Sequence, residues 1–130
     1  MKKKILCLKN TGIKKILKEF KKELKKLYGT RLKNIILYGS WVRGEATEDS
    51  DIDILLVLKG KITPGKEIDR MIDIITEINL KYNTLISVYP ISEKDYFNVN
   101  SPLLMNIRRE GTSVAVRFIA HKTMANFREA

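Results

Sequence analysis

The sequence predicts an α+β domain in which helices pack on a small mixed sheet. Two stretches, 13–27 and 63–78, repeat apolar residues at the three- and four-residue spacing of amphipathic helices. Three short apolar runs, within 34–38, 51–58 and 84–91, have the length of buried strands. A chain of 130 residues is long enough for one domain with a substantial core.

The first helix is predicted to end at Gly29, which supplies a C-terminal cap. Strand 34–38 closes at Gly39-Ser40, and "SWVRGEA" is expected to form a turn of helix or a loop. Pro64, at the first helical position, marks the start of the second long helix. The predicted buried stripes are Ile13, Ile16, Leu17, Phe20, Leu24 and Leu27 in the first helix, and Ile68, Met71, Ile72, Ile75 and Ile78 in the second.

The last third of the chain contains three more predicted elements. The strand within 84–91 is expected to end at Pro90, because proline cannot donate to a strand ladder. Ser101-Pro102 opens a short helix that stops at Gly111. The stretch "TSVAVRFIA", 112–120, is predicted to form a final strand.

The charge balance and the cysteine count limit which partners and sites the protein is expected to have. The 25 Lys and Arg against 15 Asp and Glu give a formal charge of +10, which favours a phosphate-bearing or acidic partner. Seven of the lysines lie in the first helix and are also explained by one solvated face, so we rank nucleic acid below a nucleotide or an acidic protein. The single Cys7 excludes an intramolecular disulfide and a cysteine-based zinc site.

No segment has the length of a membrane span, and the apolar run after the basic start is too short for a signal peptide. We therefore expect a cytoplasmic protein, which the single cysteine also fits. His121, the one histidine, lies in a polar stretch and is expected at the surface. Arg108 and Arg109 either meet an acidic partner or stabilise the end of their helix.

Asp51 and Asp53 begin a strand, and residues two apart in a strand point to the same face. Two carboxylates so close repel each other unless a cation lies between them. Carboxylates, retained water and phosphate oxygens are the ligands that Mg²⁺ prefers. A pair of such metals about 4 Å apart can clamp a phosphoryl displacement from both sides.

Gly39-Ser40 supplies a second half to this site. A glycine lets the backbone approach a ligand closely, and backbone N–H groups with a serine hydroxyl hold phosphate oxygens. Arg43 lies one helical turn later and can reach the same phosphates. Each feature alone is common, but here ten residues separate Ser40 from Asp51 and both halves adjoin apolar strands. The joint pattern indicates a triphosphate held by protein and metal together.

The stretch "GSWVRGEATEDSDIDILLV" resembles the signature of the nucleotidyltransferase superfamily of DNA polymerase β, and in particular that of its minimal nucleotidyltransferases (MNT). "SPLLMNIRREG" is similar to the closing segment of many short members. The resemblance extends over about 10–112 and implies a nucleotidyltransferase domain at 1–112, with a final strand and tail at 113–130. The matching motif positions are Gly39, Ser40, Arg43, Gly44, Ser50, Asp51 and Asp53.

The resemblance implies the polymerase β-like fold and Mg²⁺-dependent transfer of AMP from ATP to a protein acceptor. Small members often act as the antitoxin of an all-helical HEPN protein, some by attaching AMP to it, so a HEPN-type protein is the expected partner. By the same likeness, Asp51 and Asp53 are the catalytic residues and hold the metal, while the nucleotide is bound by Gly39, Ser40, Arg43 and Ser50.

The chain departs from the family pattern at one position. Active members usually carry a third carboxylate on a later strand, but the matching strand here offers only Ser87 and Tyr89. We place Ser87 nearest the missing position. Glu93 and Asp95 are expected beyond the strand. The acids of the second long helix are expected on its solvated face, namely Asp69, Asp73 and Glu77.

Losing a general base commonly costs about 10²–10⁴-fold in rate without removing binding. An alternative interpretation is therefore a protein that binds nucleotide and neutralises its partner by contact. Nucleic-acid binding, from charge alone, and transfer to a small molecule, which in relatives uses an added helical domain, are weaker alternatives. Trp41, inside the motif, either stacks on a base or packs against the first helix.

Overall fold

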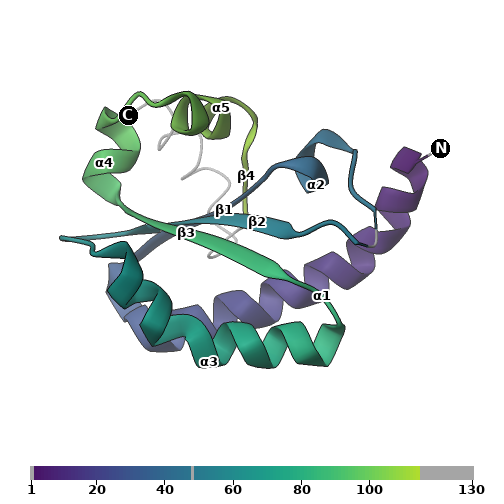
Figure 1. Cartoon of the computed structure of the whole chain (residues 1–130), viewed down its shortest axis with the longest axis horizontal. Coiled ribbons are helices and arrows are strands. Elements are labelled where there is room, and N and C mark those ends of the chain that lie inside the picture. The colour runs from purple at the N-terminus through teal and green to yellow at the C-terminus, as the bar shows by residue number, and fades with distance from the viewer. Residues whose placement is uncertain (1, 48, 115–130) are drawn as a thin grey trace.

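A computed structural model describes residues 2–47 and 49–114, with the backbone alone for 2–11. Within these residues no helix is both long enough and apolar enough to cross a bilayer. In chain order the elements are α1 (Lys2–Tyr28), the 3₁₀ turn η1 (Gly29–Arg31), β1 (Leu32–Tyr38), α2 (Ser40–Arg43), β2 (Ile52–Leu58), α3 (Pro64–Tyr82), β3 (Ile86–Ser92), α4 (Glu93–Asn98), α5 (Pro102–Glu110) and β4 (Thr112–Ser113) (Figure 1).

The four strands form one mixed sheet in the order β3-β2-β1-β4. β1 is antiparallel to both β2 and β4, whereas β2 and β3 are parallel. The parallel pair needs a crossover connection, and α3 provides it. α1 and α3 lie on one face of the sheet, and α4 and α5 lie on the other (Figure 1). The predicted α+β class with a mixed sheet is confirmed.

The larger core lies between the sheet and the pair α1 and α3. Phe20 and Leu24 of α1 and Met71 of α3 are fully buried there. The predicted burial is wrong for two residues: Leu27 is 39% exposed and Ile72 is 46% exposed. An α-helix has 3.6 residues per turn, so apolar residues spaced by three and four positions shift gradually around its axis. Some of them therefore face solvent rather than the sheet.

Near the end of α1 the inward position passes to Tyr28, four residues after Leu24. Tyr28 is buried and its hydroxyl donates a hydrogen bond to Oε1 of Glu67 on α3, at 2.7 Å. Burial and this carboxylate raise the pKa of the phenol. Glu67 is only 4% exposed, so its carboxylate needs partners within the protein, and it has the Tyr28 hydroxyl and, at 3.9 Å, Nε of Arg70.

We expect Tyr28→Phe to lower the free energy of unfolding by about 1–3 kcal/mol, because it leaves the Glu67 carboxylate short of a donor in the core. Tyr82→Phe is the matched control, since Tyr82 donates to Glu19 at a part-buried site where water can replace it. Denaturant unfolding of the two variants measures the difference. Equal losses would show that burial of Glu67 does not matter.

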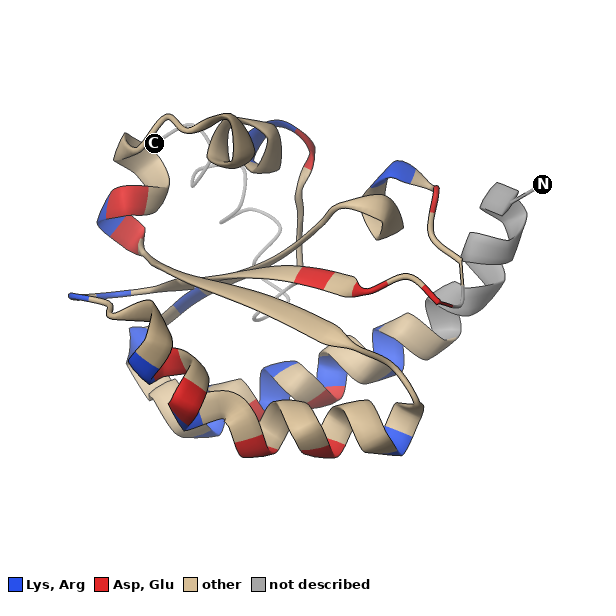
Figure 2. Ribbon diagram, in the orientation of Figure 1, with Lys and Arg blue, Asp and Glu red and all other residues tan. Residues whose placement is uncertain are grey.

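Basic residues predominate along the described part of α1, whereas α3 carries both acidic and basic residues (Figure 2). Glu19 of α1 accepts hydrogen bonds from the Tyr82 hydroxyl at 2.6 Å and from Lys81 Nζ at 3.1 Å. These donors hold the pKa of Glu19 below its ordinary value, the Tyr82 hydrogen bond most of all. The contacts fasten the end of α3 to the middle of α1.

The smaller core lies on the opposite face of the sheet, where Leu55 and Val57 of β2 pack against residues of α4 and α5. α4 was not anticipated, and its start is explained by Ser92, whose hydroxyl accepts a hydrogen bond from the Asp95 backbone N–H at 3.0 Å. Arg108 of α5 donates to the carbonyl oxygens of Tyr96 and Val99, which joins α5 to α4.

One strand prediction is corrected, and another is confirmed only for its first residues. β3 does not end at Pro90 but continues to Ser92. β3 lies at the edge of the sheet, and an edge strand tolerates a proline because one of its sides has no neighbouring strand that needs a backbone donor. The predicted final strand over 112–120 is observed only as β4, in which Ser113 pairs with Ile36 of β1. The remainder of that prediction, from 115 onward, lies outside the described residues.

Candidate functional site

Gly39 occupies the tight turn between β1 and α2. Its backbone has φ 80° and ψ −151°, a region that only glycine adopts readily. A Cβ built on Gly39 would lie 2.4 Å from Oδ2 of Asp53. The glycine is therefore required twice, once for the direction of the turn and once for the space beside the carboxylate.

α2 is a single turn of helix, as the sequence allowed. The backbone N–H groups of Val42 and Arg43 both donate to the carbonyl oxygen of Gly39 at 3.1 Å. Gly44 ends the turn in the left-handed region, at φ 78°. Because α2 is short and closed at both ends, the motif residues Ser40 and Arg43 have fixed positions above the ends of β1 and β2.

Asp53 lies in β2 between two neighbouring strands. Its Cα is paired with that of Tyr38 in β1 and with that of Ser87 in β3. Directly paired residues project from the same face of a sheet, so these three side chains share one face. It is the face that carries α4 and α5, because Leu55, two residues on, packs in that core.

Asp51 directly precedes β2 and is exposed, while Asp53 is half-buried. Burial raises the pKa of Asp53, the negative charge of Asp51 raises it further, and the positive charge of Arg43 opposes both. The two carboxylates are thus close enough to affect each other, as the sequence predicted. Arg43 lies within electrostatic reach of the same group.

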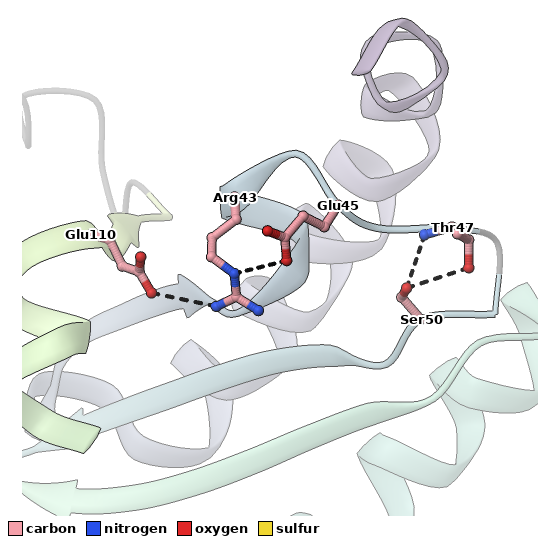
Figure 3. A network of polar contacts seen from close by, with 5 residues as sticks. All are labelled: Arg43, Glu45, Thr47, Ser50 and Glu110. Carbon is pink, nitrogen blue, oxygen red and sulfur yellow. Dashed lines mark hydrogen bonds and ion pairs between the residues drawn. The ribbon is translucent and has the colours of Figure 1, made fainter. Parts of the chain in front are cut away.

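Arg43 is already engaged by two carboxylates (Figure 3). Its Nε donates to Oε1 of Glu45 at 3.0 Å, and its Nη1 lies 3.5 Å from Oε2 of Glu110 at the end of α5. Hydrogen bonding to Glu45 is the main cause that raises the pKa of the guanidinium. The sequence analysis missed Glu110, which joins the motif from 67 residues away, and no local spacing could have indicated it.

Ser50 shapes the loop that leads into Asp51 (Figure 3). Its Oγ accepts a hydrogen bond from the Thr47 backbone N–H at 2.8 Å, and the Ser50 N–H donates to the Thr47 carbonyl oxygen at 3.0 Å. The Asp49 N–H donates to Thr47 Oγ1 at 3.2 Å. These reciprocal contacts fix the backbone immediately before the first carboxylate.

The later strand carries no acid opposite Asp53. The register places the exposed Ser87 there, as the sequence analysis expected, and Glu93 is the first residue of α4. Asp69, Asp73 and Glu77 are exposed on α3. Over residues 2–47 and 49–114, no three or more Asp, Glu, His or Cys side chains form a group that could hold a metal. Among the described residues, the site therefore offers two carboxylates for a metal, those of Asp51 and Asp53.

Two adjacent carboxylates fit a hard divalent cation that keeps water or phosphate oxygens as its other ligands. The raised pKa of Asp53 indicates what such an ion would supply, since its charge would offset both the burial and the repulsion from Asp51. Gly39 lets the Asp53 carboxylate pack directly against the turn, since a Cβ at this position would lie 2.4 Å from Asp53 Oδ2. Asp51 and Asp53 are thus the residues that could hold Mg²⁺.

Comparison with known proteins gives three findings. The family model described as nucleotidyltransferase domain matches residues 17–107. A Methanocaldococcus jannaschii protein named as a candidate protein adenylyltransferase is 42% identical over 99 residues, which span 75% of this chain and 92% of that protein. A Thermococcus cleftensis protein adenylyltransferase, MntA, is 54% identical over 44 residues, 34% of this chain and 43% of that protein.

A solved structure shares the fold. It is a crystal structure of a toxin-antitoxin with AMP-PNP, and one of its chains aligns with a TM-score of 0.52 over 82% of this chain and 83% of that chain. The two sequences are 15% identical, so the similarity concerns the fold alone. The architecture expected from the motif is confirmed by this likeness and by the family match.

Proposed function

The chain belongs to the nucleotidyltransferase domain family, and from this premise we propose that it transfers AMP from ATP to a hydroxyl group of a partner protein. The observation that carries the proposal is the close placement of Gly39 against Asp53, with Asp51 near enough to raise the pKa of Asp53. The names of the M. jannaschii and T. cleftensis relatives support protein as the acceptor class.

In this proposal Asp51 and Asp53 hold Mg²⁺. The bound ion would neutralise phosphate charge and promote loss of a proton from an oxygen that it binds. The Gly39-Ser40 turn would hold the terminal phosphates through its backbone N–H groups and the Ser40 hydroxyl. An acceptor hydroxyl oxygen forms a bond to the α-phosphorus, the bond from that phosphorus to the bridging oxygen breaks, and pyrophosphate leaves.

Arg43 and Ser50 complete the proposed nucleotide site in different ways. Arg43 would reach the phosphates by exchanging a carboxylate partner, and the 3.5 Å contact with Glu110 is the weaker of its two. Ser50 would act through the loop that it fixes with Thr47, so that Asp51 is presented at a constant position.

With Ser87 opposite Asp53, this chain offers no base at that position for the acceptor proton. The proton would pass to solvent or to a group that the partner supplies, and such a loss commonly slows transfer by about 10²–10⁴-fold. The same observation favours a second function, in which the chain binds nucleotide and neutralises its partner by contact.

For the partner we propose a toxin of the HEPN type, with this chain as its antitoxin. The fold match to a chain of a toxin-antitoxin crystal structure supports this pairing. The excess of Lys and Arg over Asp and Glu also suits an acidic protein surface.

The test is to incubate the chain with Mg²⁺, ATP labelled on the α-phosphate, and the protein encoded by the neighbouring gene. We expect label on that protein, and none with the Asp51→Ala/Asp53→Ala double variant. Asp69→Ala/Asp73→Ala is the matched control, because it also removes two carboxylates, both exposed on α3. A partner that is bound and silenced without label would overturn transfer and establish the contact mechanism.

A further inference from the structure

Glu110 is an acidic residue at the C-terminal end of α5, where a negative charge is unfavourable. The carbonyl groups of the last turn give a helix a partial negative charge at that end, which favours lysine or arginine there. Arg108 and Arg109 lie in the same turn, but Arg108 donates to carbonyl oxygens of the α4 region and Arg109 donates to the Asn106 side chain. Among the residues that the structure describes, the cation that Glu110 meets is Arg43, whose Nη1 lies 3.5 Å from Glu110 Oε2 (Figure 3).

Close packing fixes the end of α5 beside β1. Gly111 directly follows Glu110, and a Cβ on Gly111 would lie 2.6 Å from both the carbonyl oxygen of Ile107 and Cγ2 of Ile36. The next residue begins β4, which pairs with β1. β1 in turn leads into the tight turn before α2. The same strand therefore holds the backbone that carries Glu110 and the backbone that carries Arg43.

The Arg43 guanidinium lies between two carboxylates and the proposed metal and phosphate site. Burial and the charge of Asp51 raise the pKa of Asp53, and the positive charge of Arg43 lowers it, so Arg43 acts electrostatically on that site. Glu45 and Glu110 share this one guanidinium, and the three side chains together carry a net negative charge. Phosphate oxygens bind a guanidinium as carboxylates do, so a phosphate that approaches Arg43 competes with both acids.

Of the two carboxylates, Glu110 is the one that a phosphate would displace. Its contact with Arg43 is 3.5 Å long, against 3.0 Å for Glu45, and the two side chains are 33% and 44% exposed. An ion pair this exposed contributes little in water, so exchanging it for a phosphate costs little. Glu45 belongs to the same loop as Arg43 and can stay bound during the exchange.

We propose that Glu110 competes with the phosphates of the nucleotide for Arg43 and thereby limits the affinity for ATP and for pyrophosphate. The inference rests on the proposed function, because it assumes that Arg43 contacts those phosphates. When pyrophosphate leaves, the ion pair between Glu110 and Arg43 forms again, which favours release of this product. Glu110 touches Arg43 rather than the nucleotide and is therefore a positioning residue.

Glu110→Gln tests the proposal, because it keeps the shape of the side chain and removes its charge. We expect it to tighten binding of ATP, and of pyrophosphate, each with Mg²⁺, by about 2- to 5-fold, the range of an exposed ion pair. Calorimetry measures both affinities. Glu77→Gln is the matched control, since it removes the same charge at an exposed position of α3, on the other face of the sheet, and should match wild type. Because Glu110→Gln removes an unfavourable charge from the helix end, it is expected to fold, which thermal unfolding checks.

A second background separates competition for Arg43 from repulsion between Glu110 and the phosphates. In Arg43→Gln protein there is no guanidinium to compete for, so adding Glu110→Gln should give little further gain in ATP affinity. Transfer kinetics give an independent measurement. In the label-transfer assay, Glu110→Gln should lower KM for ATP to the same extent as it tightens binding, while kcat does not rise because pyrophosphate leaves more slowly.

Unchanged or weaker ATP binding by folded Glu110→Gln protein would overturn this role of Glu110 and leave the proposed function intact. An equal gain with and without Arg43 would also overturn it, because Glu110 would then act through its charge alone. Wild-type protein that binds no ATP in the presence of Mg²⁺ would contradict the proposed function itself.

Discussion

Asp53→Asn is expected to reduce transfer of AMP by about 10³-fold or more, because a metal site of this kind supplies several kcal/mol of transition-state stabilisation. Asparagine keeps the shape of the side chain but removes the charge that would hold Mg²⁺. Label transfer at saturating ATP measures the loss. Asp73→Asn, an exposed position on α3, serves as the control and should retain full activity.

The same substitution should raise stability when no metal is present. The folded protein holds the pKa of Asp53 above its ordinary value of 3.8, chiefly by burial. The folded state then binds the proton more tightly than the unfolded state, so stability falls as pH rises through this range. The penalty is fully present above the folded pKa and disappears below pH 3.8, the ordinary value.

Denaturant unfolding without Mg²⁺ should therefore show Asp53→Asn to be more stable than wild type at pH 7, with the difference closing in acid. Added Mg²⁺ should stabilise wild type and leave the variant unchanged, because only the wild type would bind the ion. A variant that is less stable than wild type at pH 7 without metal would contradict the assigned burial of charge.

Gly39→Ala is expected to lower the free energy of unfolding by about 1–3 kcal/mol and to abolish nucleotide binding. The stability loss follows from φ 80° and ψ −151°, which an alanine rarely adopts. The binding loss follows from the methyl group, which would lie 2.4 Å from Asp53 Oδ2 and must displace either the turn or the carboxylate.

Gly60→Ala separates the effect of backbone strain from the effect of a methyl group beside the Asp53 carboxylate. Gly60 also has positive φ, 94°, but a Cβ there meets no atom within 4 Å. We expect Gly60→Ala to lose stability through backbone strain while it binds ATP as wild type does. If Gly39→Ala bound ATP normally, the space beside Asp53 would have no functional importance.

Local patterns were sufficient for most of the fold. The 3.6-residue spacing located α1 and α3, Pro64 and Pro102 marked helix starts, and the Gly-Ser and Asp-x-Asp motif indicated the family that the comparison confirms. These signals depend on a residue and its near neighbours in the chain. For that reason they could not show that β3 continues past Pro90, which depends on its place at the sheet edge.

The sequence by itself therefore determined the class of fold, because helix and strand periodicities are local, and it predicted the pair of carboxylates, because Asp51 and Asp53 lie in one continuous stretch. The tertiary structure decided which groups meet that stretch. Glu110 reaches Arg43 across 67 residues, Ser87 lies opposite Asp53 through the β2–β3 register, and α1 with the α3–β3 connection forms a cavity beside Asp51. Such contacts arise only when helices and strands pack, because packing joins residues that sequence spacing keeps apart.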